Sequence, residues 1–312
     1  MADSFPTLVV DYLKSLENRG IDQIPIDEEA RLILRQWVIA SRQKNAPPPP
    51  ASTPASSLPT EKEKNDGEID VNPADTLKKL REESMQPASA AALHPVHSIP
   101  HLLGSSLEDR LAHLRQIAEN WTPSKDLGTL RTTMVFATGS PHSSIMFVGE
   151  APGYQEERQC EPFVGPAGEK LNSIIKAMGL NRSSIYISNI VKFRPSLPNQ
   201  TTNNRPPSEK EISTCLPIIT KEVELICPKV IIALGATAAK GLLGTDQTPL
   251  SALRGRFHTF AGVPVRVTYH PSYLLRTDTP TEKRKVWEDM LAVMELLNMD
   301  ISERQRNFFL SR

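Results

Sequence analysis

Two short stretches decide the fold of this chain: Gly149-Glu150-Ala151-Pro152-Gly153 and His270-Pro271-Ser272-Tyr273-Leu274-Leu275-Arg276. Each follows an apolar run typical of a β-strand, residues 145–148 before the first and 263–269 before the second. The strands of a parallel sheet end at one common edge, where open α/β folds bind their ligands. The pattern therefore predicts that a carboxylate and an imidazole meet in one crevice with a basic residue nearby. That combination indicates catalysis on an anionic polymer.

Composition excludes several classes of protein. No apolar run approaches the roughly 20 residues that span a bilayer, so we expect no membrane segment. The opening residues Met-Ala-Asp-Ser-Phe lack the basic and apolar regions of a secretory signal, so we do not expect secretion. The cysteines Cys160, Cys215 and Cys227 form no CxxC pair and suit a reducing compartment.

The formal net charge of zero conceals an asymmetry between the two parts of the chain. Residues 1–100 carry 11 Lys and Arg against 15 Asp and Glu, a net charge of −4. Residues 101–312 carry 25 against 21, a net charge of +4. A mildly basic second part is compatible with nucleic-acid binding but does not establish it.

The chain divides into four parts. Residues 1–45 contain two runs with apolar residues at helical spacing, which predict a small helical N-terminal segment. Residues 46–100 are first rich in proline and then charged, and we expect a disordered linker there. We expect a folded domain over residues 101–300 and a C-terminal tail over residues 301–312.

Strand and helix patterns alternate through the folded domain. The expected strands are 145–148, 185–188, 230–234 and 263–269, and the expected helices are 106–120, 168–178, 208–226, 237–243 and 281–298. This alternation predicts a three-layer α/β/α sandwich with a central, mostly parallel four-stranded sheet. The residues at the four strand ends, Glu150, Asn189, Gly235 and His270, should then converge.

The connection after the first strand carries two further features. Phe163 is placed to stack on a planar ligand. The helix that starts near Gly168 should point its amide N–H groups toward an anion.

The ordered set of motifs resembles the uracil-DNA glycosylase superfamily, and specifically its family 4. The matching stretches are 130–136, 145–153, 162–168, 186–192, 229–235 and 270–276, within about residues 105–298. Any one motif is weakly specific, whereas the ordered set is specific. The resemblance implies the fold of that superfamily and a monofunctional uracil-DNA glycosylase. Such an enzyme flips uracil out of DNA and hydrolyses its N-glycosidic bond, which starts base excision repair.

The resemblance also implies the catalytic and base-binding residues. Glu150 would position water or stabilise the cationic sugar, and His270 would hydrogen-bond the uracil O2 as the base leaves. Glu156 would exclude the methyl group of thymine, although a slip by one position to Glu157 stays open. The remaining substrate contacts would come from Gly149, Ala151, Phe163, which stacks on the ring, and Asn189, which reads the Watson–Crick edge.

The second stretch would bind DNA. The resemblance implies that Ser272 holds a phosphate. The segment that follows would enter the duplex and support base flipping; it comprises Tyr273, Leu274, Leu275 and Arg276.

The chain departs from the family at its metal cluster. Most family 4 members carry four cysteines that bind an iron–sulfur cluster. Here residues 119–124 hold no cysteine, Phe193 stands at the third position, and Cys215 alone remains. One thiolate cannot hold a cluster that needs four ligands. We therefore predict no cofactor and no metal, with Trp121 and Phe193 filling that space by apolar packing. Residues 199–207 also lack the basic insertion of the cross-linking class X, so we expect no covalent DNA adduct.

Two other functions stay open: a non-catalytic module that binds uracil-containing or damaged DNA, and a glycosylase for another deaminated base such as hypoxanthine or xanthine. The presence of both Glu150 and His270 argues against the first. Lyase activity is not expected, because no lysine stands as a Schiff-base nucleophile. A P-loop hydrolase is excluded, because residues 168–170 do not match GxxxxGK[ST].

The expected partner is uracil-containing DNA, single- or double-stranded, with no membrane. We expect a monomer whose N-terminal segment docks a repair or replication protein. The expected location is cytoplasmic and nucleoid-associated if the source is bacterial, and a nuclear or organellar location stays open.

Overall fold

The computed structural model describes residues 98–245 and 248–310. The helical segment expected over residues 1–45 lies outside the described residues, and so does the expected linker up to residue 97.

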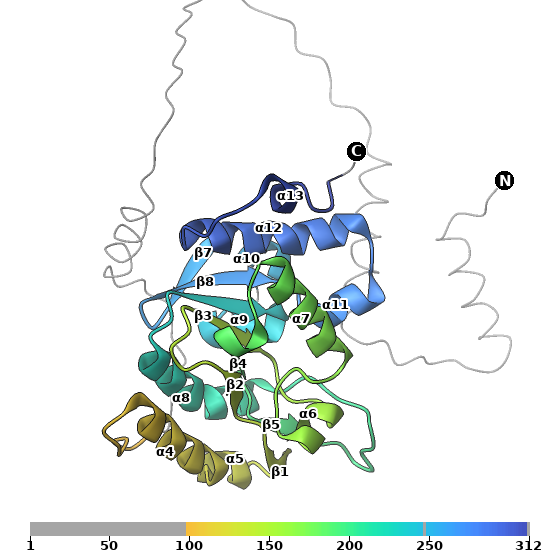
Figure 1. The fold of residues 1–312 in the computed structure, drawn as a ribbon. Helices are drawn as coiled ribbons and strands as arrows, with labels where there is room; N and C mark the ends of the chain where they lie inside the picture. The colour runs from red at the N-terminus through yellow and green to blue at the C-terminus, as the bar shows by residue number, and fades with distance from the viewer. Residues whose placement is uncertain (1–97, 246–247, 311–312) are drawn as a thin grey trace, which may run out of the picture. The chain divides into compact units, whose positions relative to one another are not determined.

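A six-stranded mixed sheet forms the centre of the described part (Figure 1). Its strand order is β2-β4-β3-β6-β8-β7, with parallel pairing among the inner four strands and antiparallel pairing at both edges. The strands are β2 (Ala137–Gly139), β3 (Ile145–Gly149), β4 (Tyr186–Asn189), β6 (Val230–Leu234), β7 (Phe257–Phe260) and β8 (Val263–Thr268). The four expected strands are the inner four, so the predicted fold class is confirmed.

The expected strand number was too small. The edge strands β2 and β7 were missed because β2 has only three residues and both lie half-exposed, so neither forms a buried apolar run. A separate two-stranded ladder, β1 (Leu130–Met134) with β5 (Phe193–Pro195), was also missed. In contrast, every residue of β3 and β6 is buried, which explains why the sequence identifies these strands.

Helices cover both faces of the sheet. On one face α8 (Glu209–Ile226) and α9 (Gly235–Leu243) pack on Met146 and Val148, and on the other α7 (Pro166–Ala177) and α12 (Pro280–Leu296) pack on Ile145 and Phe147. Figure 1 shows α12 above the sheet and α8 below it. Alternate residues of one strand thus enter two separate cores.

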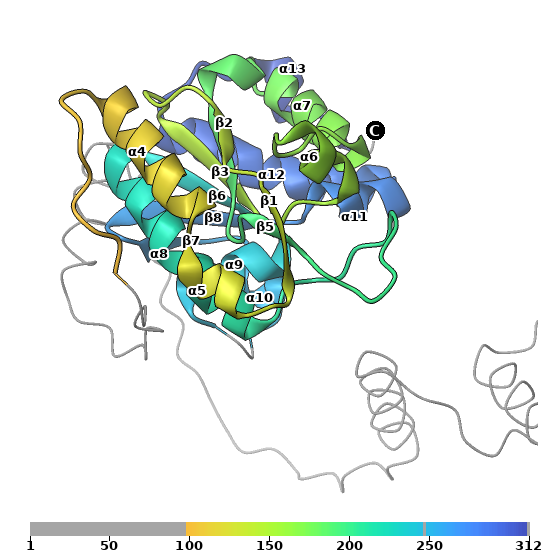
Figure 2. The same ribbon diagram turned by 90° about the horizontal axis from the view of Figure 1, so that it is seen from below.

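Two N-terminal helices pack on the outer side of α8. These are α4 (Leu107–Glu119) and α5 (Thr122–Asp126), and Figure 2 shows α4 beside α8. A capping box closes the start of α4: the Asp109 backbone N–H donates to Ser106 Oγ at 3.0 Å, and the Ser106 N–H donates to the Asp109 carboxylate at 3.2 Å. The remaining helices are α6 (Tyr154–Gln159), α10 (Leu250–Leu253), α11 (Pro271–Arg276), α13 (Glu303–Arg306) and the 3₁₀ turn η1 (Arg182–Ser184).

The end of the chain contacts the domain. The indole N–H of Trp287 donates to the Gln305 carbonyl at 2.6 Å, and the Gln305 side-chain amide donates to the Ala177 carbonyl at 2.9 Å. The expected C-terminal tail therefore packs across α12 and α7 as far as residue 308. None of the described helices is long and apolar enough to cross a membrane.

Candidate active site

A pocket of about 230 Å³ opens at the carboxyl edge of the inner strands, a size that suits one small ring. It is lined by Glu150, Ala151, Pro152, Gly153, Glu156, Phe163, Ala167, Asn189, Asn204, Arg205, His270 and Ser272. Of the expected catalytic and base-binding residues, Gly149 alone does not line it. The four residues of the 273–276 segment do not line it either.

Glu150 lies in the loop between β3 and α6. Burial raises the pKa of its carboxyl group, and a hydrogen bond from the Thr237 hydroxyl partly opposes that rise. Thr237 belongs to α9, which follows β6, so two neighbouring strands build this pair. Sequence reasoning missed Thr237, because a threonine near a helix N-terminus usually signals only a cap.

His270 lies just after β8, the last inner strand, which ends at Thr268, and it caps α11. Its Nδ1 accepts a hydrogen bond from the Ser272 backbone N–H at 3.2 Å and lies 2.8 Å from Ser272 Oγ. Burial lowers the pKa of His270 to about 4, and the positive charge of Arg276 adds to that effect. The imidazole is therefore neutral at pH 7, and with Nδ1 acting as acceptor its proton is on Nε2.

Asn189 lies at the end of β4, beside Gly149 on β3. Its side chain is 2% exposed, and no partner is recorded for its Oδ1 atom among the described residues. A buried amide oxygen without a partner costs free energy, so it marks a place where a ligand can donate a hydrogen bond.

Gly149 is required by close packing. A Cβ atom there would lie 2.4 Å from Asn189 Oδ1 and 2.4 Å from the Phe163 ring. Any side chain would push apart two residues of the pocket wall. Gly149 therefore shapes the pocket from beneath.

Phe163 forms one wall of the pocket and is 5% exposed. Its backbone has a φ of +55°, which is uncommon for a residue other than glycine. Its ring centroid lies 5.7 Å from that of His270, with the planes inclined by 33°. The ring both packs into the core and lines the pocket.

Glu156 supports the Phe163 loop. Its carboxylate accepts hydrogen bonds from the backbone N–H groups of Val164 and Gly165, at 3.2 and 3.0 Å. Gly165 caps α7, so this carboxylate occupies helix-terminal amides that we expected to face an external anion. The neighbouring Glu157 pairs with Arg131 and Arg194 and does not line the pocket, so Glu156 is the carboxylate that faces it.

The segment expected to bind DNA is a short helix, because Pro271 at its first position favours a helical start. Leu274 is 3% exposed and buried in the protein, whereas Leu275 is 47% exposed. Tyr273 stacks on Tyr269 with ring centroids 4.7 Å apart, and its hydroxyl donates to Glu282 at 3.1 Å. Leu275 and Arg276 are thus the residues of this helix that face outward.

The positions of the missing cluster cysteines form a packed part of the core. Trp121 and Phe193 are both buried in one apolar cluster, as predicted, and the Trp121 indole donates to the Thr214 carbonyl at 2.9 Å. Cys215 is fully buried, with Ser124 Oγ 3.5 Å from its sulfur. In the described ranges no group of three or more His, Cys, Asp or Glu could hold a metal ion. The residues present do not fit a four-thiolate cluster.

Fold and site together define an α/β protein with a small pocket at the carboxyl edge of its sheet, lined by the carboxylate of Glu150 and the neutral imidazole of His270. Comparison with known proteins is more specific. The model of the uracil DNA glycosylase superfamily matches residues 136–291, half of the chain. The chain therefore belongs to that superfamily, and the predicted family is confirmed.

Proteins named type-4 uracil-DNA glycosylase are similar to this chain. That of Thermotoga maritima is 38% identical over 161 residues, which cover 51% of this chain and 81% of the relative. That of Sulfurisphaera tokodaii is 36% identical over 178 residues, which cover 54% and 77%. That of Saccharolobus solfataricus is 36% identical over 180 residues, which cover 55% and 80%.

Proposed function

We propose that this chain is a monofunctional uracil-DNA glycosylase that accepts a flipped-out uracil in the pocket beside Glu150 and His270. Its membership of the superfamily makes it a DNA glycosylase. One observation carries the proposal: Asn189, whose buried Oδ1 has no partner among the described residues, lines the same pocket as the neutral imidazole of His270. An amide can accept from one edge of uracil and donate to it, while Nε2–H donates to a carbonyl oxygen.

His270 stabilises the leaving base. When the bond between C1′ and N1 breaks, its electron pair goes to uracil and negative charge develops on the O2 oxygen. A positioned N–H donor in a water-poor site stabilises that charge strongly. Because the pKa of His270 is about 4, the imidazole acts as a neutral donor at pH 7 and transfers no proton.

Glu150 acts on the sugar. Loss of the base leaves a cationic sugar, and a nearby carboxylate stabilises it and orients the water that attacks C1′. The product is an abasic sugar with a new hydroxyl group, and the proton released by the water neutralises the uracil anion. The carboxylate must be ionised for this role, so the raised pKa of Glu150 sets the acid limit of activity.

The residues of α11 have two roles: some contact DNA beside the pocket, and others hold the helix on the protein. Leu275 enters the base stack, and Arg276 and Ser272 contact backbone phosphates. Tyr273 and Leu274 hold the helix in place, as their stacking and burial indicate. Flipping costs a few kcal/mol, which insertion of an apolar side chain partly offsets.

We also propose that this activity needs no iron–sulfur cluster. The support is that Cys215 stands without neighbouring thiols and that Trp121 and Phe193 already pack the surrounding core. Iron analysis and absorbance near 400 nm on freshly purified protein test this. A colourless, active preparation with less than one iron per ten chains is expected, and a brown, iron-loaded one contradicts the proposal.

The function is tested with labelled oligonucleotides that carry one uracil, in single-stranded and duplex form. Abasic sites are cleaved with alkali, and matched strands with thymine, hypoxanthine or xanthine serve as comparisons. We expect uracil release and no release of thymine. No release of any base at excess enzyme rejects the glycosylase, and tight binding without release identifies a binding module instead. Release of hypoxanthine or xanthine but not uracil would identify a glycosylase for another deaminated base.

A further inference from the structure

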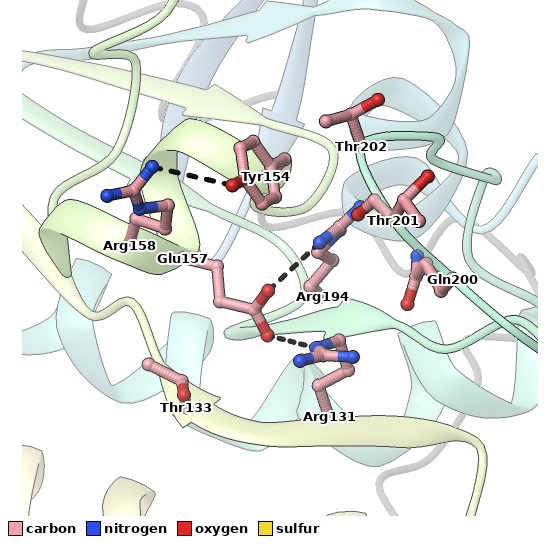
Figure 3. A pocket seen from close by; sticks show the side chains of 9 residues that line it. All are labelled: Arg131, Thr133, Tyr154, Glu157, Arg158, Arg194, Gln200, Thr201 and Thr202. Carbon is pink, nitrogen blue, oxygen red and sulfur yellow. Dashed lines mark hydrogen bonds and ion pairs between the residues drawn. The ribbon is translucent and has the colours of Figure 1, made fainter.

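A second pocket, of about 480 Å³, lies on the other side of α6 from the candidate active site. Figure 3 shows its side chains, which come from β1, α6, β5 and the loop after β5. They are Arg131, Thr133, Tyr154, Glu157, Arg158, Arg194, Gln200, Thr201 and Thr202. None of them has a role in the proposed chemistry.

The pocket has an excess of positive charge. Three arginines face one carboxylate, which leaves two positive charges uncompensated among the lining residues. Glu157 is 8% exposed and pairs with Arg194 at 3.0 Å and also with Arg131 (Figure 3). The carboxylate therefore holds the pocket together without neutralising it.

The three arginines differ in how many of their guanidinium N–H groups already donate hydrogen bonds within the protein. Arg194 is 1% exposed and makes four hydrogen bonds with its five N–H donors: it donates to Glu157, to Asn204 Oδ1 at 2.8 Å and to two backbone carbonyls of the loop. It is a structural residue. Arg131 is 44% exposed, and in the part of the chain that the structure describes only its Nε has a recorded partner. Arg158 is also exposed, and among the described residues both of its contacts are with Tyr154: Nη1 lies 3.4 Å from the hydroxyl, and the guanidinium carbon lies 5.7 Å from the ring centroid.

The free donors match one kind of ligand. The terminal nitrogens of a guanidinium form a planar fork that binds phosphate in a bidentate manner. Hydroxyl groups of Thr133, Thr201 and Thr202 stand at the same pocket and can add hydrogen bonds to phosphate oxygens. An uncharged or cationic ligand would leave the excess charge unpaired.

The two pockets share a wall. Glu156 of α6 faces the candidate active site, and the next residue, Glu157, faces the arginines. The loop after β5 also contributes to both pockets. Its residues Thr201 and Thr202 line the arginine pocket, and Asn204 and Arg205 line the candidate active site. Arg194 connects the two through its bond to Asn204. A chain molecule bound in one pocket can therefore continue into the other.

We propose that the arginine pocket binds a backbone phosphate of the DNA strand that carries the target base, next to the flipped nucleotide. Arg131 and Arg158 contact the phosphate. Glu157, itself held by Arg194, positions Arg131, and Tyr154 positions Arg158. α11 contacts the strand at a different wall of the active site, so the strand is held at two places around the flipped base. The inference rests on the proposed function, because it takes DNA as the substrate.

Salt dependence tests the phosphate contact. The variants are Arg131→Gln, Arg158→Gln and the double variant, with Arg306→Gln as the matched control. Arg306 is 54% exposed, pairs with Glu295 and lies on α13, outside both pockets. Each pocket variant should lower the slope of log Kd against log salt by about 0.7 on a single strand. The double variant should weaken kcat/KM about tenfold through KM, with kcat unchanged, and Arg→Lys should restore part of the slope.

A chemical probe locates the contact. Oligonucleotides with one neutral methylphosphonate linkage, placed in turn at each of the four linkages on either side of the target base, are compared. The wild-type protein should lose about tenfold in affinity at one linkage, and the double variant should lose nothing there. The inference is overturned if the double variant behaves like Arg306→Gln, or if no linkage distinguishes it from the wild type. The salt slope and the methylphosphonate comparison measure binding alone, so these two readouts stay decisive even if the chain releases no uracil.

Discussion

Glu222 in the core and Glu150 at the candidate active site are two glutamates whose surroundings differ. Glu222 of α8 is 0% exposed and is surrounded by partners: it pairs with Lys192 and accepts hydrogen bonds from Ser188 Oγ at 2.8 Å and Tyr186 OH at 3.1 Å. Glu150 is half-buried at the pocket, and among the described side chains only Thr237 donates to it. Burial raises the pKa of both.

The difference between Glu222 and Glu150 shows that burial alone does not identify a functional carboxylate. Glu222 uses its oxygens on three partners of the core, so it can stabilise the strand that carries Asn189 but has no access to a substrate. Glu150 faces a cavity and retains capacity for a ligand or water. The partners, and not the raised pKa, separate a structural carboxylate from a catalytic one.

The largest effect should come from breaking the Glu222 network. Glu222→Leu leaves the Lys192 ammonium buried without its partner, and we expect the free energy of unfolding to fall by about 3–5 kcal/mol. The double variant Lys192→Met, Glu222→Leu should lose less than Glu222→Leu alone, because no unpaired charge remains. Urea denaturation measures both. A cost below about 1 kcal/mol for Glu222→Leu would show that the pair does not hold the core.

The next largest effect concerns the pH dependence of stability and arises from His270 in the candidate active site. His270 has a pKa of about 4 in the folded protein against about 6.5 when unfolded, so between these values the unfolded chain binds the extra proton. Stability should therefore fall as the pH falls from 6.5 to 4, by about 3 kcal/mol from this residue. His270→Gln should lack this part of the pH dependence. Identical pH profiles of unfolding for the two proteins would mean that His270 is not buried as a neutral group.

A smaller effect on stability is expected at Glu150. Its pKa is raised, so the folded protein favours the protonated form and loses stability as the pH rises through that pKa. Glu150→Gln keeps an acceptor for Thr237 and removes the charge, so it should be more stable than the wild type at pH 8, with the difference shrinking toward pH 4. Thermal unfolding at both pH values measures this. A loss of stability at pH 8 would place Glu150 with Glu222 as a structural residue.

The smallest effect should come from Thr237. Thr237→Val removes the hydrogen bond that lowers the pKa of Glu150, so the acid limb of kcat/KM should move to higher pH. One such bond contributes about 1 kcal/mol, so kcat/KM should fall by up to about fivefold on the acid limb. Thr237→Ser should restore the wild-type profile. An unshifted acid limb in Thr237→Val would mean that Thr237 does not act through Glu150.

The sequence identifies the inner sheet and most of the pocket because both depend on local patterns. Buried apolar runs produce β3 and β6, and Glu150 and His270 follow the strands directly. The edge strands escape detection because they are short and half-exposed. The segment after His270 is a helix, which the proline at its first position favours.

Pairs of residues far apart in the chain could not be predicted in the same way. Thr237 and Glu150 are separated by 87 residues, and Glu157 and Arg194 by 37. No periodicity or motif in one sequence indicates that such side chains meet. The arginine pocket was missed for that reason, since its charge becomes visible only when β1, α6 and β5 come together.

The most direct test of the catalytic account is a single-turnover comparison of Glu150→Gln with the wild type on a uracil-containing oligonucleotide, with Kd measured on the same strand. We predict that the rate of uracil release falls by about 10²–10⁴ while Kd changes less than about threefold, because the carboxylate acts in the transition state. A rate within about threefold of the wild type would contradict the assignment of Glu150 and with it the chemistry proposed for this pocket.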